Sequence, residues 1–515
     1  MLLQEFLENS ASRHPDREAL VSGDRRLSFG EIDNMANQLA HTLRDSGVGY
    51  GDRVAILIDN SPETVIALWA VLKADAVFLI INPTTKSDKI RYILGNCRAA
   101  ALITHQSRWR QAAEAAAEAE SLKTVICAGD KAGELKESSP DTLTFLTLDE
   151  ALNDAPGTRP ERKAIDIDLA ALIYTSGSTG NPKGVMLTHL NMVAASTSVS
   201  TYLENTENDR IINVLPLSFD YGLYQVIMAA QFSGTVILER SFTYPYQTIK
   251  LIHEEKATGF PIVPTMSAIL LQMKELAKED FSNLRYITNT AAALPVSHIN
   301  GLRDVFPSTK IYSMYGLTEC KRVSYLHPDQ IDIRPESVGK GMPNEQVYLV
   351  DENDDLITRP DVTGELVVRG ANVMKGYWEL PEETARRLRP GIHPWEKSLY
   401  TGDLFRMDKE GYLYFVSRRD DIIKSRGEKV SPREVENALY AIEDVVEAAV
   451  TGVPDDILGE AVKAFVVLKD GSELSEKAII AHCSRNLEDF MVPKIIELRE
   501  SLPRTTTGKI TTKNL

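Results

Sequence analysis

Short apolar runs separated by helix-length segments constrain the fold of this chain more than any other feature. Residues 54–58 and 76–81 are typical of buried strands, and Ser61-Pro62-Glu63 between them begins a helix with proline in the first turn. Together they predict a βαβ unit. Similar runs follow at residues 211–215, 235–238, 259–263 and 284–288. This alternation predicts an α/β fold of layered, mainly parallel β-sheets covered by helices, with ligands at the carboxyl ends of the strands.

Residues 171–190, ALIYTSGSTGNPKGVMLTHL, form the most distinctive single segment. An apolar strand leads into a loop rich in hydroxyl groups and glycine, with one lysine, namely Thr175, Ser176, Gly177, Ser178, Thr179, Gly180 and Lys183. Glycines allow backbone N–H groups to turn toward an anion, and the lysine adds positive charge. The loop is therefore predicted to bind the phosphates of a nucleotide triphosphate. Its spacing differs from a Walker loop, and a flexible linker is the less favoured alternative because an apolar strand directly precedes it.

This loop resembles the signature loop of the adenylate-forming superfamily, which includes acyl-CoA synthetases, amino-acid adenylation enzymes of nonribosomal peptide synthesis and firefly luciferase. Four further motifs follow in the order of that family, so that the resemblance covers nearly the whole chain. They are MYGLTE at 314–319, YTGD at 400–403, SRRDDIIKSRGEKVSP at 417–432 and PRTTTGKI at 503–510. The resemblance implies a large N-terminal adenylation domain, residues 1–419, and a small mobile α+β C-terminal lid, residues 420–515, with a hinge near Asp420.

The family's reaction implies roles for residues near the phosphates. A carboxylate attacks the α-phosphate of ATP, pyrophosphate leaves and an acyl-adenylate forms. By resemblance, Thr175, Ser176, Thr179 and Lys183 hold the β- and γ-phosphates, and Glu319 positions Mg²⁺. Lys509 matches the lysine that bridges the substrate carboxylate and the α-phosphate. Thr175, Glu319 and Lys509 are thus the expected catalytic residues.

The remaining nucleotide contacts are also inferred from the matching motifs. Tyr315 matches the aromatic residue that stacks on adenine, and Thr318 lies beside it in the sequence. Asp403 matches the carboxylate that accepts hydrogen bonds from the ribose hydroxyls, and Arg418 completes that contact. Outside these motifs, a core aromatic residue and a turn aspartate would be the ordinary interpretations. Ser417 departs from the family, which usually has glycine before this arginine.

The acid substrate is predicted from Asp220, in the segment LPLSFDYGLYQ. Asp220 resembles the aspartate of amino-acid adenylation domains, which pairs with the substrate's α-ammonium group, and this favours an amino acid, small or cyclic like proline. The pocket would be lined by Tyr221, Tyr224, Tyr312 and Met314. The alternatives are an acyl-CoA synthetase acting on a non-amino carboxylic or fatty acid, with Asp220 in a surface turn, and ordinary core packing for at least one of the four lining residues.

The acceptor is expected to be a phosphopantetheine thiol outside this chain, because no carrier segment follows Lys509 before Leu515. A separate carrier protein and coenzyme A are both compatible, and Gly427 matches the glycine that lines the pantetheine tunnel. A luciferase-like oxygenase and a catalytically inactive nucleotide-binding regulator are the competing functions. The second is disfavoured because Lys183, Glu319, Asp403 and Lys509 are all present.

Composition excludes several partners. The net charge of −16 disfavours nucleic acid and anionic membranes as main partners. Neither a signal peptide nor a membrane span is expected, which predicts a cytoplasmic enzyme. The cysteines at 97, 127, 320 and 483 have no metal-site spacing and are expected to be reduced thiols.

Local patterns predict further elements. Residues 106–120 are expected to form a helix, and the polar stretch 129–168 a surface excursion before the signature strand. In the lid, a capping box at Ser431-Pro432-Arg433-Glu434 opens a helix. Strands at 445–450 and 461–468 and a helix at 475–486 should follow.

Overall fold

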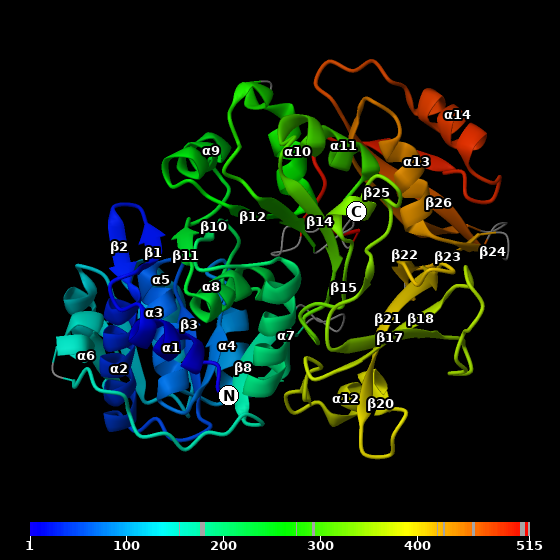
Figure 1. The fold of residues 1–515 in the computed structure, drawn as a ribbon. Helices are drawn as coiled ribbons and strands as arrows, with labels where there is room; N and C mark the ends of the chain where they lie inside the picture. The colour runs from blue at the N-terminus through cyan, green and yellow to red at the C-terminus, as the bar shows by residue number, and fades with distance from the viewer. Residues whose placement is uncertain are drawn as a thin grey trace.

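The structure is a computed structural model, and it describes residues 1–153, 155–175, 181–273, 275–290, 294–419, 421–425, 428–455, 459–504 and 510–512. Within them, four sheets with flanking helices build a large α/β domain and a small C-terminal domain (Figure 1). In this part of the chain no helix is long and apolar enough to cross a membrane. The described cysteines are all buried and free.

The first sheet has the strand order β16-β15-β14-β13-β12-β10-β11-β1-β2. Neighbouring strands are parallel from β14 to β1 and antiparallel at both edges. The bounds are β1 Glu18–Ser22, β2 Arg25–Ser28, β10 Arg210–Asn213, β11 Thr235–Leu238, β12 Gly259–Ile262, β13 Tyr286–Asn289, β14 Lys310–Tyr315, β15 Ser324–Tyr325 and β16 Lys340–Gly341.

The second sheet has the order β19-β9-β8-β4-β3-β5-β6-β7 and is parallel from β8 to β7. The predicted βαβ unit is present as β3-α3-β4. The bounds are β3 Arg53–Leu57, β4 Val77–Ile80, β5 Ala99–His105, β6 Thr124–Ala128, β7 Thr144–Thr147, β8 Leu169–Thr175, β9 Lys183–Thr188 and β19 Gly376–Tyr377.

Helices cover both sheets and pack between them. α3 and α8 are apolar around most of their circumference, and both are buried along most of their length in a core that also contains residues of both sheets. α2 begins with a capping box in which Ser28 and Glu31 each accept the other's backbone N–H. The helices are α1 Glu5–Arg13, α2 Phe29–Asp45, α3 Pro62–Lys73, α4 Ser87–Cys97, α5 Gln106–Glu118, α6 Leu148–Asn153, α7 His189–Tyr202, α8 Asp220–Phe232, α9 Pro245–Glu254, α10 Pro264–Gln272, α11 Val296–Val305 and α12 Pro381–Arg387, with 3₁₀ turns at Ala132–Ser138, Leu276–Lys278 and Pro328–Gln330.

The third sheet differs from the mainly parallel pattern because all its pairs are antiparallel. Its order is β17-β18-β21-β20, and β22 also pairs with β21. β20, β21 and β22 follow one another as antiparallel neighbours, whereas the connection from β18 to β20 contains β19, which belongs to the second sheet, and α12. The bounds are β17 Glu345–Val350, β18 Gly364–Gly370, β20 Leu388–Pro390, β21 Lys397–Met407 and β22 Leu413–Arg418.

The small domain contains the fourth sheet and two helices. The strand order is β24-β23-β26-β25, and β27 pairs with β26. Figure 1 shows these orange and red elements beside α10 and α11, where the rings of His298 and Tyr440 lie 6.2 Å apart. The bounds are β23 Ile423–Ser425, β24 Glu428–Val430, α13 Pro432–Tyr440, β25 Val445–Asp455, β26 Gly459–Leu468, α14 Glu476–Asn486 and β27 Ile495–Leu498.

One local prediction needs correction. Residues 129–168 are not only a surface excursion, because β7 pairs with β6 and α6 follows it. Phe145 of β7 is buried against the Trp109 ring, at 5.2 Å between centroids. This edge strand was not predicted because it consists of only four residues, TFLT, within a polar segment. The helix start expected at Ser431 is present, because Ser431 Oγ accepts from Glu434 N, and the same hydroxyl also donates to the carbonyl oxygen of Val416 at 2.5 Å.

Candidate active site

The hairpin of β8 and β9 positions the two ends of the predicted phosphate loop. Thr175 ends β8 and Lys183 begins β9, and the two residues are antiparallel partners. The Thr175 hydroxyl donates to the Lys183 carbonyl oxygen at 3.5 Å. Ser176, Gly177, Ser178, Thr179 and Gly180 lie outside the described residues. The flanking strands nevertheless fix where this loop leaves and re-enters the sheet.

The Lys183 side chain contacts groups that sequence reasoning did not find. Its Nζ lies 2.8 Å from Glu383 Oε2 and 5.7 Å from the centre of the Tyr377 ring. The lysine hydrogen bond is the main reason why the pKa of Glu383 lies below its ordinary value. Nothing in the sequence around Glu383, on the first turn of α12, distinguishes it from a solvent-exposed helix residue.

Tyr377 connects this lysine to Glu319. The Tyr377 hydroxyl donates to Glu319 Oε1 at 2.7 Å, and burial raises the pKa of the phenol above its ordinary value. The described residues contain no cluster of three or more potential metal ligands. Glu319 alone is nevertheless compatible with Mg²⁺, which is typically bound through one or two carboxylates together with substrate phosphates.

Tyr315, Asp403 and Arg418 come together although they are far apart in the sequence. The Tyr315 hydroxyl donates to Asp403 Oδ2 at 2.5 Å, and Arg418 Nε lies 3.7 Å from Asp403 Oδ1. Asp403 and Arg418 are direct partners on β21 and β22. The Tyr315 ring packs edge-on against Phe405 at 4.8 Å. Thr318 is half-buried in the connection that follows β14.

Asp220 has a cationic partner within the protein. It begins α8, and its Oδ2 lies 3.6 Å from Lys321 Nζ, which also donates to the Asp220 carbonyl oxygen at 3.1 Å. Lys321 is fully buried, and burial lowers the pKa of its ammonium to about 7. An internal cation therefore occupies the position predicted for the substrate's ammonium group.

The four predicted lining residues are buried among protein groups. The Tyr221 hydroxyl donates to the Thr288 carbonyl oxygen, Tyr224 lies beneath Lys321 at 4.4 Å, and Met314 Sδ accepts from the Tyr202 hydroxyl. Tyr312 packs near Tyr202 and Tyr286. Tyr221, Tyr312 and Met314 belong to one hydrophobic cluster and Tyr224 to another, and their role in an acid pocket stays a prediction.

Lys321 and its neighbour Arg322 are the main residues that the sequence prediction missed. The sequence contains a sign of this pair, because two adjacent basic residues stand one position after the MYGLTE motif, in MYGLTECKRVSYL. Lys509, Asp420 and Gly427 lie outside the described residues. A bridge between Arg504 and Ile510 brackets the segment that contains Lys509.

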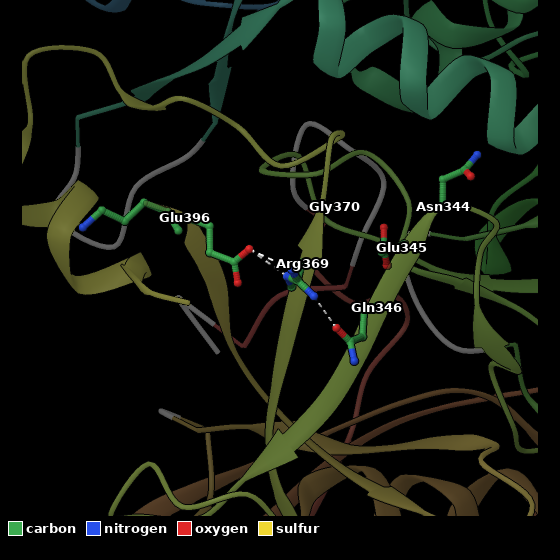
Figure 2. Close-up of a pocket in the computed structure, with 7 residues that line it drawn as sticks. Asn344, Glu345, Gln346, Arg369, Gly370 and Glu396 are labelled. Carbon is green, nitrogen blue, oxygen red and sulfur yellow. Dashed lines mark hydrogen bonds and ion pairs between the residues drawn. The ribbon is translucent and has the colours of Figure 1, made fainter. Parts of the chain in front are cut away.

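A separate hollow of about 480 Å³ opens on the third sheet (Figure 2). Arg369 crosses it and binds Glu396 and Gln346. Glu345, at its side, holds the Asn372 amide at 2.6 Å, and burial raises its pKa well above the ordinary value. None of the predicted nucleotide or substrate residues lines this hollow.

Comparison with known proteins matches the whole chain. Residues 7–378 match the family model for AMP-binding enzymes, and residues 434–509 match the model of the AMP-binding enzyme C-terminal domain. The long-chain-fatty-acid–CoA ligase of Bacillus subtilis (strain 168) is 33% identical over 542 aligned residues, which cover 100% of this chain and 94% of that protein.

Solved structures of CoA ligases are similar to this chain over nearly its whole length. The crystal structure of an anthranilate CoA ligase with anthranoyl-AMP has a TM-score of 0.89 at 28% identity, covering 99% of this chain and 95% of that one. O-succinylbenzoate CoA synthetase from Bacillus subtilis, in complex with ATP and magnesium ion, has a TM-score of 0.83 at 26% identity, covering 99% and 98%. The chain therefore belongs to the AMP-binding enzyme family and has the adenylate-forming enzyme fold of the AMP-forming ligases.

Proposed function

We propose that this enzyme is an ATP-dependent, AMP-forming acid–CoA ligase. One observation supports it above all, a continuous line of side chains across the candidate site. Lys183 lies over Tyr377, Tyr377 binds Glu319, and the same motif carries Tyr315, which binds Asp403. Cationic, carboxylate and aromatic groups thus follow one another in the order that the phosphates, Mg²⁺ and adenosine of ATP require.

Each group has a proposed task. Lys183 and Thr175 hold the β- and γ-phosphates together with the loop between them, and Asp403 with Arg418 holds the ribose beside the Tyr315 ring. Glu319 holds Mg²⁺, which neutralises phosphate charge when bound. The substrate carboxylate then attacks the α-phosphate, the bond to pyrophosphate breaks, and Lys509 contacts both reacting groups. In the second step a thiolate attacks the acyl carbon, AMP leaves, and the thiol proton passes to solvent.

A non-amino carboxylic acid is the better proposal for the substrate. Asp220 already has a cationic partner in Lys321, so binding an ammonium group would require two cations at one carboxylate. The relatives named above are CoA ligases, which favours coenzyme A over a carrier protein as acceptor. We also propose a division at residue 420, with Asp420 as hinge and Gly427 beside the pantetheine arm, so that one lid serves both steps.

The test measures each step separately. ATP–pyrophosphate exchange is followed with carboxylic acids of increasing length and with amino acids including proline, and thioester formation is then followed with CoA and with a phosphopantetheinylated carrier protein. We expect exchange with unaminated acids and thioester formation on CoA. Exchange only with an amino acid, or transfer only to the carrier protein, would overturn the substrate or the acceptor assignment. Absence of exchange with every acid would overturn the adenylation itself.

A further inference from the structure

Two adjacent cations are buried beside the proposed acid site. Lys321 and Arg322 are each 2% exposed, in the connection that follows β14. Lys321 Nζ has one carboxylate partner, Asp220, at 3.6 Å. Arg322 binds the Thr290 hydroxyl, its guanidinium lies 5.4 Å from the Tyr221 ring centre, and its buried Nε has no hydrogen-bond partner among the described residues. Asp220 thus pairs with Lys321, and among the described residues no carboxylate forms an ion pair with the Arg322 guanidinium.

Lys73 shows how the same chain compensates a buried cation that has only a structural role. Its side chain is 1% exposed, and its Nζ lies 3.2 Å from Glu8 and 2.8 Å from Asp33, with Asn37 Oδ1 also at 2.8 Å. Nearby Arg162 and Arg159 complete the charge balance at Glu8. In the described part of the chain, Arg322 has no carboxylate in an ion pair with it. Burying a guanidinium in this way is costly unless a ligand supplies the missing anion.

Hydrogen bonds and close contacts fix the backbone that carries these two side chains. The Asn372 amide donates to the carbonyl oxygens of Cys320 and Arg322, at 2.9 and 3.2 Å. Lys321 has a φ of 67°, a left-handed conformation that non-glycine residues adopt only under constraint. The chain also approaches itself closely here, because a Cβ on Gly316 would lie 2.4 Å from the Lys321 carbonyl oxygen. The loop is thus built to present these two charges.

We propose that Lys321 and Arg322 form a subsite for a second anionic group on the acid substrate, so that the enzyme prefers dicarboxylic acids to monocarboxylic acids of the same length. The inference rests on the proposed ligase function. Lys321 is only two residues beyond Glu319, and the predicted acid-site residues Tyr221 and Tyr224 contact the cations. Asp220, with 22% of its side chain exposed, is the member of the cluster closest to solvent. The distal carboxylate joins Arg322 and Lys321 in charge-assisted hydrogen bonds.

The test compares matched acids of equal chain length, such as adipate with hexanoate and glutarate with pentanoate, by kcat/KM for CoA-dependent AMP release. We expect the wild-type enzyme to favour each diacid by about 10- to 100-fold, the range for a charge-assisted pair. Arg322→Met and Lys321→Met should abolish this preference chiefly through the KM of the diacid, while the monoacid is used as well as before or better. Arg322→Lys should restore part of it.

Lys340→Met is the matched control. Lys340 also lies 4.4 Å over a tyrosine ring, that of Tyr412, but it is exposed. This variant should keep the diacid preference. A second readout is the melting temperature, because Arg322→Met removes a buried charge without a carboxylate partner. The variant should melt no lower than wild type, and adipate should stabilise only the wild-type protein.

The outcomes separate this inference from the function on which it rests. If the wild-type enzyme makes CoA thioesters from monoacids and not from diacids, or if both variants keep the wild-type ratio, the anionic subsite is wrong and the ligase stands. If Arg322→Met melts much lower than wild type and the ratio is unchanged in Lys321→Met, the pair has a structural role only. If no acid of either class supports CoA-dependent AMP release, the proposed function itself fails.

Discussion

Lys183 and Glu383 form an ion pair of 2.8 Å that joins the first residue of β9 to the first turn of α12. Both side chains are more than two-thirds buried. The lysine proposed to hold ATP phosphates is thus held by a protein carboxylate, and it must leave Glu383 to reach a nucleotide. This internal competition has a measurable consequence.

Glu383→Gln should lower the KM for ATP by about 2- to 5-fold, because a partly exposed ion pair contributes up to about 1 kcal/mol and a phosphate no longer has to displace it. Steady-state kinetics at saturating acid and CoA measure this. Glu382→Gln, one residue earlier and exposed, should leave the KM unchanged. A higher KM in Glu383→Gln would mean that Glu383 positions Lys183 for the nucleotide instead of competing for it.

Asp403→Asn should weaken recognition of the ribose. We expect the KM for ATP to rise by about 10- to 100-fold, as for the loss of hydrogen bonds to a charged acceptor, and the preference for ATP over 3′-deoxy-ATP to shrink. Tyr315→Phe removes only the hydroxyl bound to Asp403 and should keep that preference. An unchanged preference in Asp403→Asn would place the ribose elsewhere.

Folding stability should fall in acid because of His189. Burial lowers the pKa of His189 to about 4, and its Nδ1 accepts the Leu3 backbone N–H at 3.1 Å. The unfolded chain takes up this proton near pH 6.5 and the folded chain only near pH 4, so the contribution is complete above pH 6.5 and is lost as the pH falls toward 4. The total is about 3 kcal/mol.

Urea denaturation between pH 4 and 7 tests this dependence. His189→Asn keeps an acceptor for Leu3 and should flatten the pH dependence. His327→Asn should not, because His327 also accepts a backbone N–H but is exposed. An equal slope in wild type and His189→Asn would assign the acid sensitivity to other groups.

Lys73→Met should destabilise the large domain by about 3 kcal/mol, because it removes a buried cation between Glu8 and the partly buried Asp33, and only Glu8 keeps other cations, Arg162 and Arg159. Lys89→Met, on an exposed position of α4, should change the urea midpoint little. If Lys73→Met changes the free energy of unfolding only slightly, Lys73 is no longer a valid example of a compensated buried cation with which to compare Arg322.

The sequence predicted those parts of the fold that depend on local pattern. β3, α3 and β4 follow from apolar runs and a proline-led helix, and their parallel register was expected. The proximity of Tyr315 and Asp403, 88 positions apart, was accessible only through the family resemblance. Their proposed roles in ATP binding await the kinetic tests.

The partner of Asp220 was not predictable in the same way. Asp220 and Lys321 are separated by 101 positions and meet because α8 and the β14–β15 connection end at the same edge of a sheet. No spacing rule in the sequence predicts such an ion pair. Without knowledge of Lys321, Asp220 resembled the aspartate that binds the ammonium group in amino-acid adenylation domains. The edge strand β7 was not predicted for a different reason, because only a few apolar residues distinguish its sequence from that of a polar loop.

The Ser431 hydroxyl serves two partners at once. It caps α13 by accepting Glu434 N, and it gives its proton to the Val416 carbonyl oxygen at the end of the large domain. Any rotation of the small domain that separates Ser431 from Val416 leaves the cap in place but frees a carbonyl group that water must then satisfy. This hydrogen bond and the ring contact between His298 and Tyr440 both favour the present orientation, so the rotation proposed for the lid has to break both.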